Sequence, residues 1–268
     1  MNHLTVYVLQ RMAVTHVVFD FDGLLVDTEA CYTKANEAIL EKYGRRFTPE
    51  LNSRVMGRRE ADAIPWLLNE VNLAGKITLS EYLTQYDTIL AEMFLKCKAM
   101  PGAERLVRHF HKKGIPQAIC SGSRGSTFGP RREPHKEWLD LIPLKVFCGD
   151  EPDIKRGKPY PDPYLAAVNK RVVNYVYFWK ICLRFDFSQL RRYVLCTNIF
   201  PVKPSDPSKV LVFEDSPNGG RSAKAAGMKC VMVPNEKFRK EALEIGVTQV
   251  LDSLLEFRPE EYGLPPFD

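Results

Sequence analysis

The sequence contains no long apolar run, no low-complexity tract and no CxxC pair of cysteines. Its seven cysteines lie mostly in apolar runs, which favours reduced, buried thiols and argues against a disulfide framework or a zinc site. Hydrophobic residues make up 45% of the chain and charged residues 26%, as in an ordinary globular protein. The first residues lack the basic leader of a signal peptide. We therefore expect a soluble, cytoplasmic protein that has no membrane as a partner.

Neither sign of charge dominates the sequence. Lys and Arg number 38 and Asp and Glu 33, which gives a formal net charge of +5, and the basic residues are scattered. This pattern argues against a nucleic-acid polymer as partner. The local basic clusters are interpreted as solvated surface, although an anionic substrate would suit one of them. The clusters are Arg45-Arg46, Arg58-Arg59, Arg131-Arg132 and Arg191-Arg192.

Five short apolar runs predict the strands of a parallel sheet. They lack an alternation of polar and apolar residues, which is typical of strands that are buried on both faces. Helical stretches such as 103–113 and 218–226 lie between some of them, so strand and helix alternate. The predicted fold class is α/β, a doubly wound, Rossmann-like parallel sheet. The predicted strands are 16–19, 115–120, 144–148, 210–213 and 229–233.

A helical region interrupts this alternation after the first strand. Between residues 30 and 99 the sequence predicts helices at 32–43, 60–71 and 80–96 and no strand. Met100-Pro101-Gly102 would then end a helix and return the chain to the sheet. We predict a core domain of residues 1–29 and 100–268, with a helical cap of residues 30–99 inserted into it. The length of 268 residues fits such a pair of domains.

Two carboxylates directly follow the first predicted strand, in the segment DFDGLLVDTE at 20–29. Residues i and i+2 share a face of a strand, and Gly23 permits a turn, so Asp20 and Asp22 could point to one site. Such a pair fits phosphoryl transfer, in which Asp20 attacks phosphorus while Asp22 first donates and later accepts a proton. A cation such as Mg²⁺ would relieve the repulsion between the acids. An ordinary turn capped by aspartate is the alternative for this motif alone.

Four segments, in order, resemble the motifs of the haloacid dehalogenase-like superfamily, in its phosphatase branch. They are DFDGLLVDTE at 20–29, CSGS at 120–123, RGKPYPDPY at 156–164 and the pair Glu214-Asp215 after a predicted strand. Taken singly, the last three could be a loop, a surface lysine and a helix cap. The resemblance implies that Asp20 is the nucleophile and a metal ligand. It also implies that Asp22 is the general acid and base and offers its backbone carbonyl to the metal.

The resemblance implies roles for the remaining motif residues as well. The hydroxyl of Ser121 and the next backbone N–H, that of Gly122, would hold the phosphate. Gly122 stands where close relatives usually carry Ser or Asn. Lys158 would neutralise both the nucleophile and the phosphate, and Pro-rich sequence after it would keep its loop rigid. Asp215 would bind Mg²⁺ directly, and Glu214 would bind it directly or through water.

The linking segments resemble those of the pseudouridine-5′-phosphatase group within this superfamily. They include VMGRR, MPGAERL, HKEW and VFEDSPNG. This likeness implies a small phosphate ester as substrate, pseudouridine 5′-monophosphate, hydrolysed to pseudouridine and phosphate. Two alternatives stay open: a sugar-phosphate mutase or sugar phosphatase of the same branch, and a non-catalytic binding protein. The sequence does not indicate an oligomeric state.

Residues 172–199 have no counterpart in the resembling proteins. Seven of these residues are aromatic, and neither Gly nor Pro interrupts them. Their apolar part, 172–183, is too short to span a membrane, which needs about 20 residues. We interpret the segment as an atypical insertion that could disable the site. Our hypothesis is a translated intron or a gene-model error, which the presence of these codons in mature message would refute.

Overall fold

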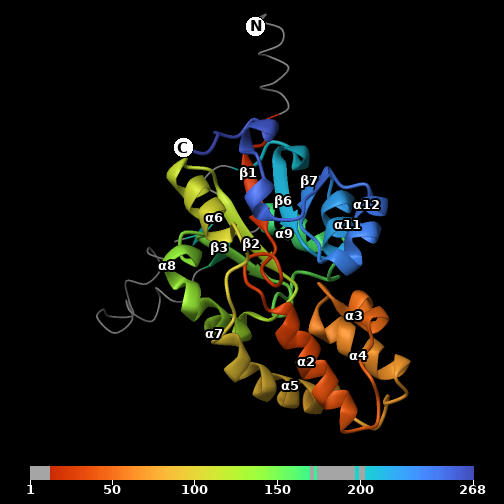
Figure 1. Ribbon diagram of the computed structural model, residues 1–268. Coiled ribbons are helices and arrows are strands. Elements are labelled where there is room, and N and C mark those ends of the chain that lie inside the picture. The colour runs from red at the N-terminus through yellow and green to blue at the C-terminus, as the bar shows by residue number, and fades with distance from the viewer. Residues whose placement is uncertain (1–12, 170–171, 174–196, 199–202) are drawn as a thin grey trace, which may run out of the picture.

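A parallel sheet forms the centre of the computed structural model, which describes residues 13–169, 172–173, 197–198 and 203–268 (Figure 1). Six strands pair in the order β3-β2-β1-β6-β7-β8, and every pair is parallel. All five predicted strands are present, and the predicted fold class is confirmed. The strands are β1 (His16–Phe19), β2 (Gln117–Ser121), β3 (Leu144–Phe147), β6 (Val210–Glu214), β7 (Lys229–Met232) and β8 (Gln249–Val250).

The central strands are apolar because both faces of the sheet are covered. Every residue of β1, β2 and β6 is buried. On one face Phe19 stacks on Phe213, with ring centroids 5.1 Å apart. The neighbouring Val18 belongs to a separate apolar cluster on the other face, together with Val212. Successive residues of β1 therefore fill two different cores.

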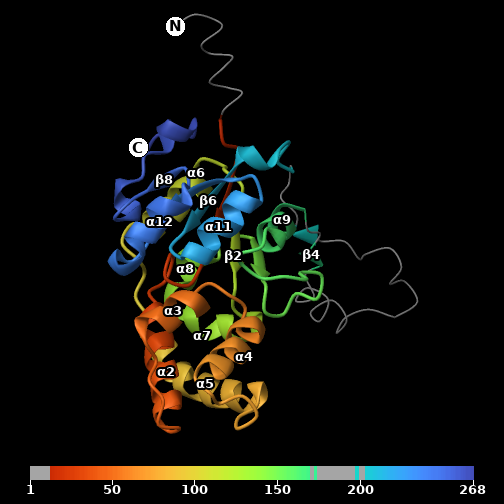
Figure 2. The ribbon, with the colours of Figure 1, turned by 90° about the vertical axis from the view of Figure 1, so that its right-hand side faces the viewer.

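Helices cover both faces of the sheet (Figures 1 and 2). The side chains of α6 (Ala103–Lys112) and α8 (Lys136–Leu139) join the core that contains Phe19. Those of α9 (Asp162–Asn169), α11 (Pro217–Ala225) and α12 (Arg239–Ile245) join the core that contains Val18. A further short helix, α7 (Phe128–Arg132), follows β2. Among the described residues, the 3-10 turns are Gly125–Thr127, Glu133–His135, Pro207–Lys209, Glu236–Phe238, Leu254–Glu256 and Pro259–Tyr262.

Four helices between residues 29 and 94 form a separate layer, which lies below the sheet in Figures 1 and 2. They are α2 (Glu29–Glu41), α3 (Pro49–Val55), α4 (Glu60–Glu70) and α5 (Leu79–Phe94). Helix α5 begins with a capping box, in which Thr78 Oγ1 accepts from the Glu81 N–H and the Glu81 side chain accepts from the Thr78 N–H. Tyr32 of α2 stacks on Tyr86 of α5. The helices that the sequence predicted here are present, together with α3.

The two chain segments that join this layer to the sheet run side by side. Val26 and Ala99 form an antiparallel bridge. On either side of it, the Asp27 N–H donates to the Lys98 carbonyl at 2.9 Å and the Met100 N–H donates to the Leu25 carbonyl at 3.0 Å. The chain therefore leaves and re-enters the sheet at one place.

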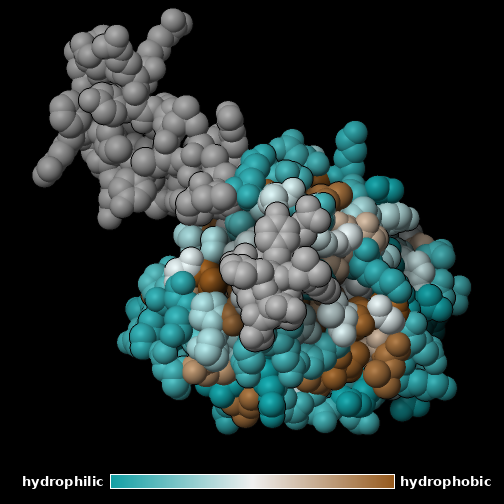
Figure 3. Space-filling view, turned by 90° about the horizontal axis from the view of Figure 1, so that it is seen from above, coloured by the Kyte–Doolittle hydropathy of each residue, from teal (hydrophilic) through white to brown (hydrophobic). Residues whose placement is uncertain are grey.

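Most of the predicted insertion at 172–199 lies outside the described residues. Within it, β4 (Val172–Val173) and β5 (Thr197–Asn198) pair as an antiparallel ribbon. Seen from above, the described surface is mainly hydrophilic with smaller hydrophobic areas (Figure 3). No helix among the described residues has the length and apolar character needed to cross a membrane.

Candidate active site

The predicted site residues meet at the carboxyl edge of the sheet. Asp20 directly follows β1, Ser121 ends β2 and Glu214 ends β6. Because β1 lies between β2 and β6 and all three are parallel, their carboxyl ends meet at the same edge. Lys158 reaches this edge from the loop before α9, and its side chain is fully buried.

Lys158 links two of the predicted acids. Its ammonium donates to Asp20 Oδ1 and to Glu214 Oε1, each at 2.5 Å, and to the Cys120 carbonyl at 3.2 Å. Burial alone would lower the pKa of Lys158, but the charges of Asp20 and Glu214 raise it well above its ordinary value. Lys158 is therefore a fixed cation beside the predicted nucleophile.

Three buried carboxylates offer oxygen ligands for a cation. One oxygen each from Asp20, Glu214 and Asp215 lies within 4.8 Å of the others. Burial raises the pKa of Asp20 to about 8 despite the nearby Lys158, and burial together with the Asp20 charge raises that of Asp215 well above its ordinary value. At Gly23, which has φ +83°, an added Cβ would lie 2.1 Å from Asp215 Oδ2, so glycine keeps this space free. Crowded carboxylate oxygens that ionise with difficulty fit a hard divalent cation such as Mg²⁺.

Glu214 differs from Asp215 because both of its oxygens are bonded within the protein. Oε1 accepts from Lys158 and from the Tyr164 hydroxyl. Oε2 accepts from the Asp215 N–H at 3.1 Å, and from the Ser216 N–H at 3.2 Å and hydroxyl at 3.1 Å. These bonds fix Lys158 and the start of α11. They make Asp215 the better candidate for a direct metal ligand.

Asp22 lies at the centre of a second network. Its Oδ1 accepts from Thr28 Oγ1 at 2.9 Å and from the Tyr32 hydroxyl at 3.0 Å. Its Oδ2 accepts from Ser121 Oγ at 2.9 Å and from Ser123 Oγ at 3.1 Å. The predicted phosphate-binding residue Ser121 therefore contacts the predicted acid and base directly.

Arg131 completes this network, and the interpretation of its cluster as solvated surface is wrong for this residue. Its side chain is fully buried, and Nη1 donates to both oxygens of Asp22, at 2.6 and 2.8 Å. The guanidinium lies 5.2 Å from the ring centres of Phe21 and Phe94. Burial alone would raise the pKa of Asp22, but the charge and hydrogen bonds of Arg131 hold it below its ordinary value. One feature of the sequence could have indicated that Arg131 is buried. It lies three residues after the apolar Phe128 on α7, and residues i and i+3 share a face of a helix.

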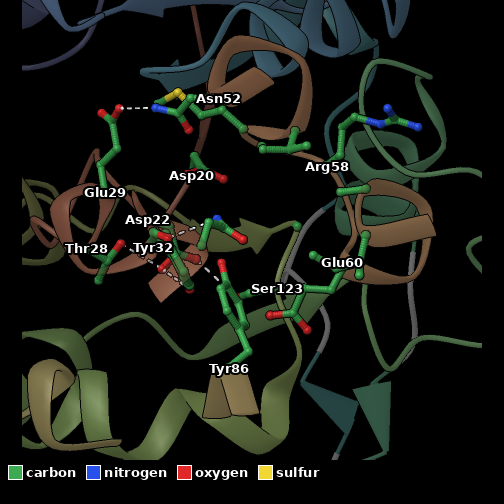
Figure 4. Close-up of a pocket in the computed structure, with 17 residues that line it drawn as sticks. Asp20, Asp22, Thr28, Glu29, Tyr32, Asn52, Arg58, Glu60, Tyr86 and Ser123 are labelled. Carbon is green, nitrogen blue, oxygen red and sulfur yellow. Dashed lines mark hydrogen bonds between the residues drawn. The ribbon is translucent and has the colours of Figure 1, made fainter. Parts of the chain in front are cut away.

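A cavity lies between the sheet edge and the helical layer. Asp20, Asp22, Gly122 and Ser123 line it from the sheet side. From the helical side its lining includes Tyr32, Asn52, Arg58, Glu60 and Tyr86 (Figure 4). The structure thus brings both predicted aspartates and Gly122 into one cavity.

Several polar contacts hold the helical layer against the sheet. Arg59, just before α4, donates to the carbonyls of Ile154 and Lys155 at 2.8 and 3.0 Å. Asn218 of α11 donates to the Met56 carbonyl at 2.9 Å. These bonds fix the connection between α3 and α4, which contributes Met56, Gly57 and Arg58 to the cavity lining, against the sheet layer.

A lysine and three carboxylates lie together at the edge of a parallel sheet, and one of these carboxylates, that of Asp20, lines a cavity under a helical layer. This arrangement is typical of an α/β enzyme for an anionic substrate. Residues 14–176 match the family described as haloacid dehalogenase-like hydrolase. The chain belongs to this family, as its motifs predicted.

Named relatives narrow the class further. The chain is similar to (DL)-glycerol-3-phosphatase 1, mitochondrial, of Arabidopsis thaliana, with 37% identity over 96% of this chain and 76% of that protein. A Drosophila melanogaster protein named "Probable pseudouridine-5′-phosphatase" is 36% identical over 95% of this chain and 96% of its own length. The crystal structure of β-phosphoglucomutase from Clostridium difficile shares the fold, with a TM-score of 0.67 and 17% identity over 93% of this chain and 96% of that one. The prediction that the chain is an enzyme of the phosphatase class is confirmed.

Proposed function

We propose that this phosphatase depends on Mg²⁺ and hydrolyses a small phosphomonoester through a phosphoaspartate on Asp20. The single observation that carries the proposal is the position of Asp20. Its carboxylate lines the cavity, is bonded to the buried cation of Lys158 and lies in a cluster with Asp215 and Glu214.

The reaction has two displacements at phosphorus. In the first, a carboxylate oxygen of Asp20 attacks phosphorus, the ester P–O bond breaks, and Asp22 gives a proton to the leaving oxygen. In the second, water attacks phosphorus, Asp22 takes a proton from the water, and the P–O bond to Asp20 breaks. Phosphate is released and Asp20 is regenerated.

The residues around Asp20 would stabilise the phosphoryl group during both displacements. The Ser121 hydroxyl and the Gly122 N–H would hold its oxygens, and Lys158 would offset their charge. Asp20, Asp215, the backbone carbonyl of Asp22 and Glu214 would hold Mg²⁺, with Glu214 directly or through water. Bound there, the ion would neutralise part of the negative charge that the phosphate and the carboxylates bring together.

The helical layer would act as the predicted cap, residues 30–99, over a core of residues 1–29 and 100–268. Two observations support this division. The two connecting segments pair at Val26 and Ala99, and the cavity lies between the layer and the sheet. A cap that closes over the substrate would exclude water other than the attacking molecule.

Pseudouridine 5′-monophosphate is the substrate that we propose first. The similarity to the Drosophila relative supports it. The Arabidopsis relative supports glycerol 3-phosphate as the second candidate. The cytosolic location stays a prediction.

Phosphate release from a panel of esters tests this proposal. The panel contains pseudouridine 5′-monophosphate, glycerol 3-phosphate and sugar phosphates, each with Mg²⁺ or with a chelator. We expect release by the wild type in Mg²⁺, none with the chelator, and a loss of at least 1,000-fold for Asp20→Asn because the nucleophile is missing. Transfer of phosphate within a sugar without net release would favour a mutase. Folded wild type that releases nothing would favour a non-catalytic binding protein.

A further inference from the structure

Glu60 occupies the wall of the cavity that faces the proposed reaction centre. It is the first residue of α4, and its carboxylate turns inward toward Ser123 and Tyr86 (Figure 4). Its side chain is only 13% exposed. The neighbouring Arg58 also lines the cavity, but its guanidinium points away from Asp20 (Figure 4).

Arg124, from the loop after β2, holds Glu60 in this position. Its Nε donates to Glu60 Oε2, and its two terminal nitrogens donate to the two oxygens of Asp87 on α5. The hydrogen bonds of Arg124 to Glu60 and Asp87 thus fix the orientation of the Glu60 side chain in the cavity. Burial raises the pKa of Glu60, and the charge of Arg124 opposes this effect.

The negative charges around the cavity restrict which leaving groups of a phosphate ester it can accept. Asp20, Asp22, Glu29 and Glu60 all line it. An ionised carboxylate accepts hydrogen bonds and donates none, so Glu60 favours a leaving group that carries O–H or N–H donors. A second phosphate on the leaving group would be repelled by the same carboxylate.

We propose that Glu60 determines specificity by accepting hydrogen bonds from the leaving group of the substrate. The class selected is an uncharged alcohol rich in O–H or N–H donors, such as a nucleoside or a polyol, and phosphomonoesters with a second phosphate are disfavoured. This inference rests on the proposed function. It also gives the chain a way to tell pseudouridine 5′-monophosphate from uridine 5′-monophosphate, because the carbon-linked base carries one more ring N–H.

The variant Glu60→Gln, assayed with four substrates, tests this inference. Pseudouridine 5′-monophosphate and glycerol 3-phosphate carry donors, fructose 1,6-bisphosphate carries a second phosphate, and the p-nitrophenyl group of p-nitrophenyl phosphate carries no donor. For the first two we expect kcat/KM to fall roughly tenfold or more, as for the loss of a hydrogen bond to a charged group. For p-nitrophenyl phosphate we expect a change of less than about threefold, and the bisphosphate should improve relative to the other substrates.

Asp87→Asn is the matched control, since Asp87 shares Arg124 with Glu60 but does not line the cavity. It should change the four values of kcat/KM by a common factor. If Glu60→Gln also lowers all four by a common factor, Glu60 acts only through Arg124 and the inference is overturned. That outcome leaves the proposed function intact provided that Asp20→Asn abolishes release. A wild type that releases no phosphate from any of the four would instead overturn the proposed function together with this inference.

Discussion

Arg131 and Asp22 form an ion pair whose cation has no exposure to solvent. A buried guanidinium is costly without an anion, and Asp22 supplies one through two hydrogen bonds from a single nitrogen. Thr28 and Tyr32 donate to Oδ1 of the same carboxylate. The orientation of the proposed general acid and base therefore depends on Arg131.

Arg131→Met tests this dependence, because methionine would fill the space between Phe21 and Phe94 without a charge. We expect kcat to fall about tenfold or more with a smaller change in KM, and the free energy of unfolding to fall by about 3 kcal/mol. Arg131→Lys, which restores a cation, should recover most of kcat. Steady-state kinetics and thermal unfolding measure both effects.

Arg132→Met is the matched control at the neighbouring position, where the side chain is 31% exposed and pairs with Asp140. It should leave kcat unchanged within about twofold, as expected for a surface salt bridge. An Arg131→Met enzyme with normal kcat would contradict the role assigned to Arg131. So would an Arg131→Lys enzyme as impaired as Arg131→Met.

The sequence predicted Asp20, Lys158 and Asp215 because each belongs to a motif with a definite place relative to a buried strand or a Pro-rich loop. It could not predict Arg131 or Glu60 in the same way. Their positions result from the packing of helices against the sheet edge, and neither residue belongs to one of the four motifs. Two consecutive arginines such as Arg131-Arg132 are ordinarily both exposed. Here the side chain of Arg131 is buried and that of Arg132 lies at the surface.

At the scale of elements, glycines let the helical layer approach the sheet. A Cβ added at Gly122, in the loop after β2, would lie 2.7 Å from the Gly57 carbonyl oxygen and 3.2 Å from that of Arg58. Gly57, with φ +73°, has the Ser216 hydroxyl 2.4 Å from the position of its own missing Cβ. The connection between α3 and α4 therefore rests on two loops that carry proposed site residues.

Gly122→Ser should push this connection away from the sheet, since the neighbouring atoms are backbone and cannot turn aside. We expect KM to rise at least threefold and the melting temperature to fall. Gly129→Ala, on α7, is the control, because an added Cβ there meets nothing within 4 Å. It should keep KM and raise stability slightly, as alanine usually does in a helix. Unchanged kinetics in Gly122→Ser would show that the layer does not need this close approach.

The elements themselves were predicted to different degrees. Five strands were found because their runs are mainly apolar and lack a regular alternation of polar and apolar residues. Strand β8 was missed because it is two residues long and only half-buried. Helix α3 was missed because its seven residues are too few for a clear periodicity, although Thr48 and Pro49 mark its start.

At the scale of the whole molecule, the site is assembled from distant parts of the chain. Asp20 and Lys158 are 138 residues apart in sequence, and Lys158 and Glu214 are 56 apart. The predicted insertion lies in the sequence between the motif with Lys158 and the motif with Glu214. Its two ends pair with each other as β4 and β5, so the chain leaves and returns at one place. The ion pair of Lys158 with Glu214 thus joins the third and fourth motifs, which lie on either side of that segment in the sequence.

The phosphoaspartate mechanism is tested most directly by trapping the phosphoryl group on the protein. Wild type would be mixed with pseudouridine 5′-monophosphate or glycerol 3-phosphate in Mg²⁺, quenched in acid within a single turnover, and digested for mass spectrometry. If Asp20 is the nucleophile, we expect a phosphorylated peptide in which the modified residue is Asp20, and no such peptide from Asp20→Asn. Phosphate found on another residue, or release by Asp20→Asn at the wild-type rate, would contradict this mechanism.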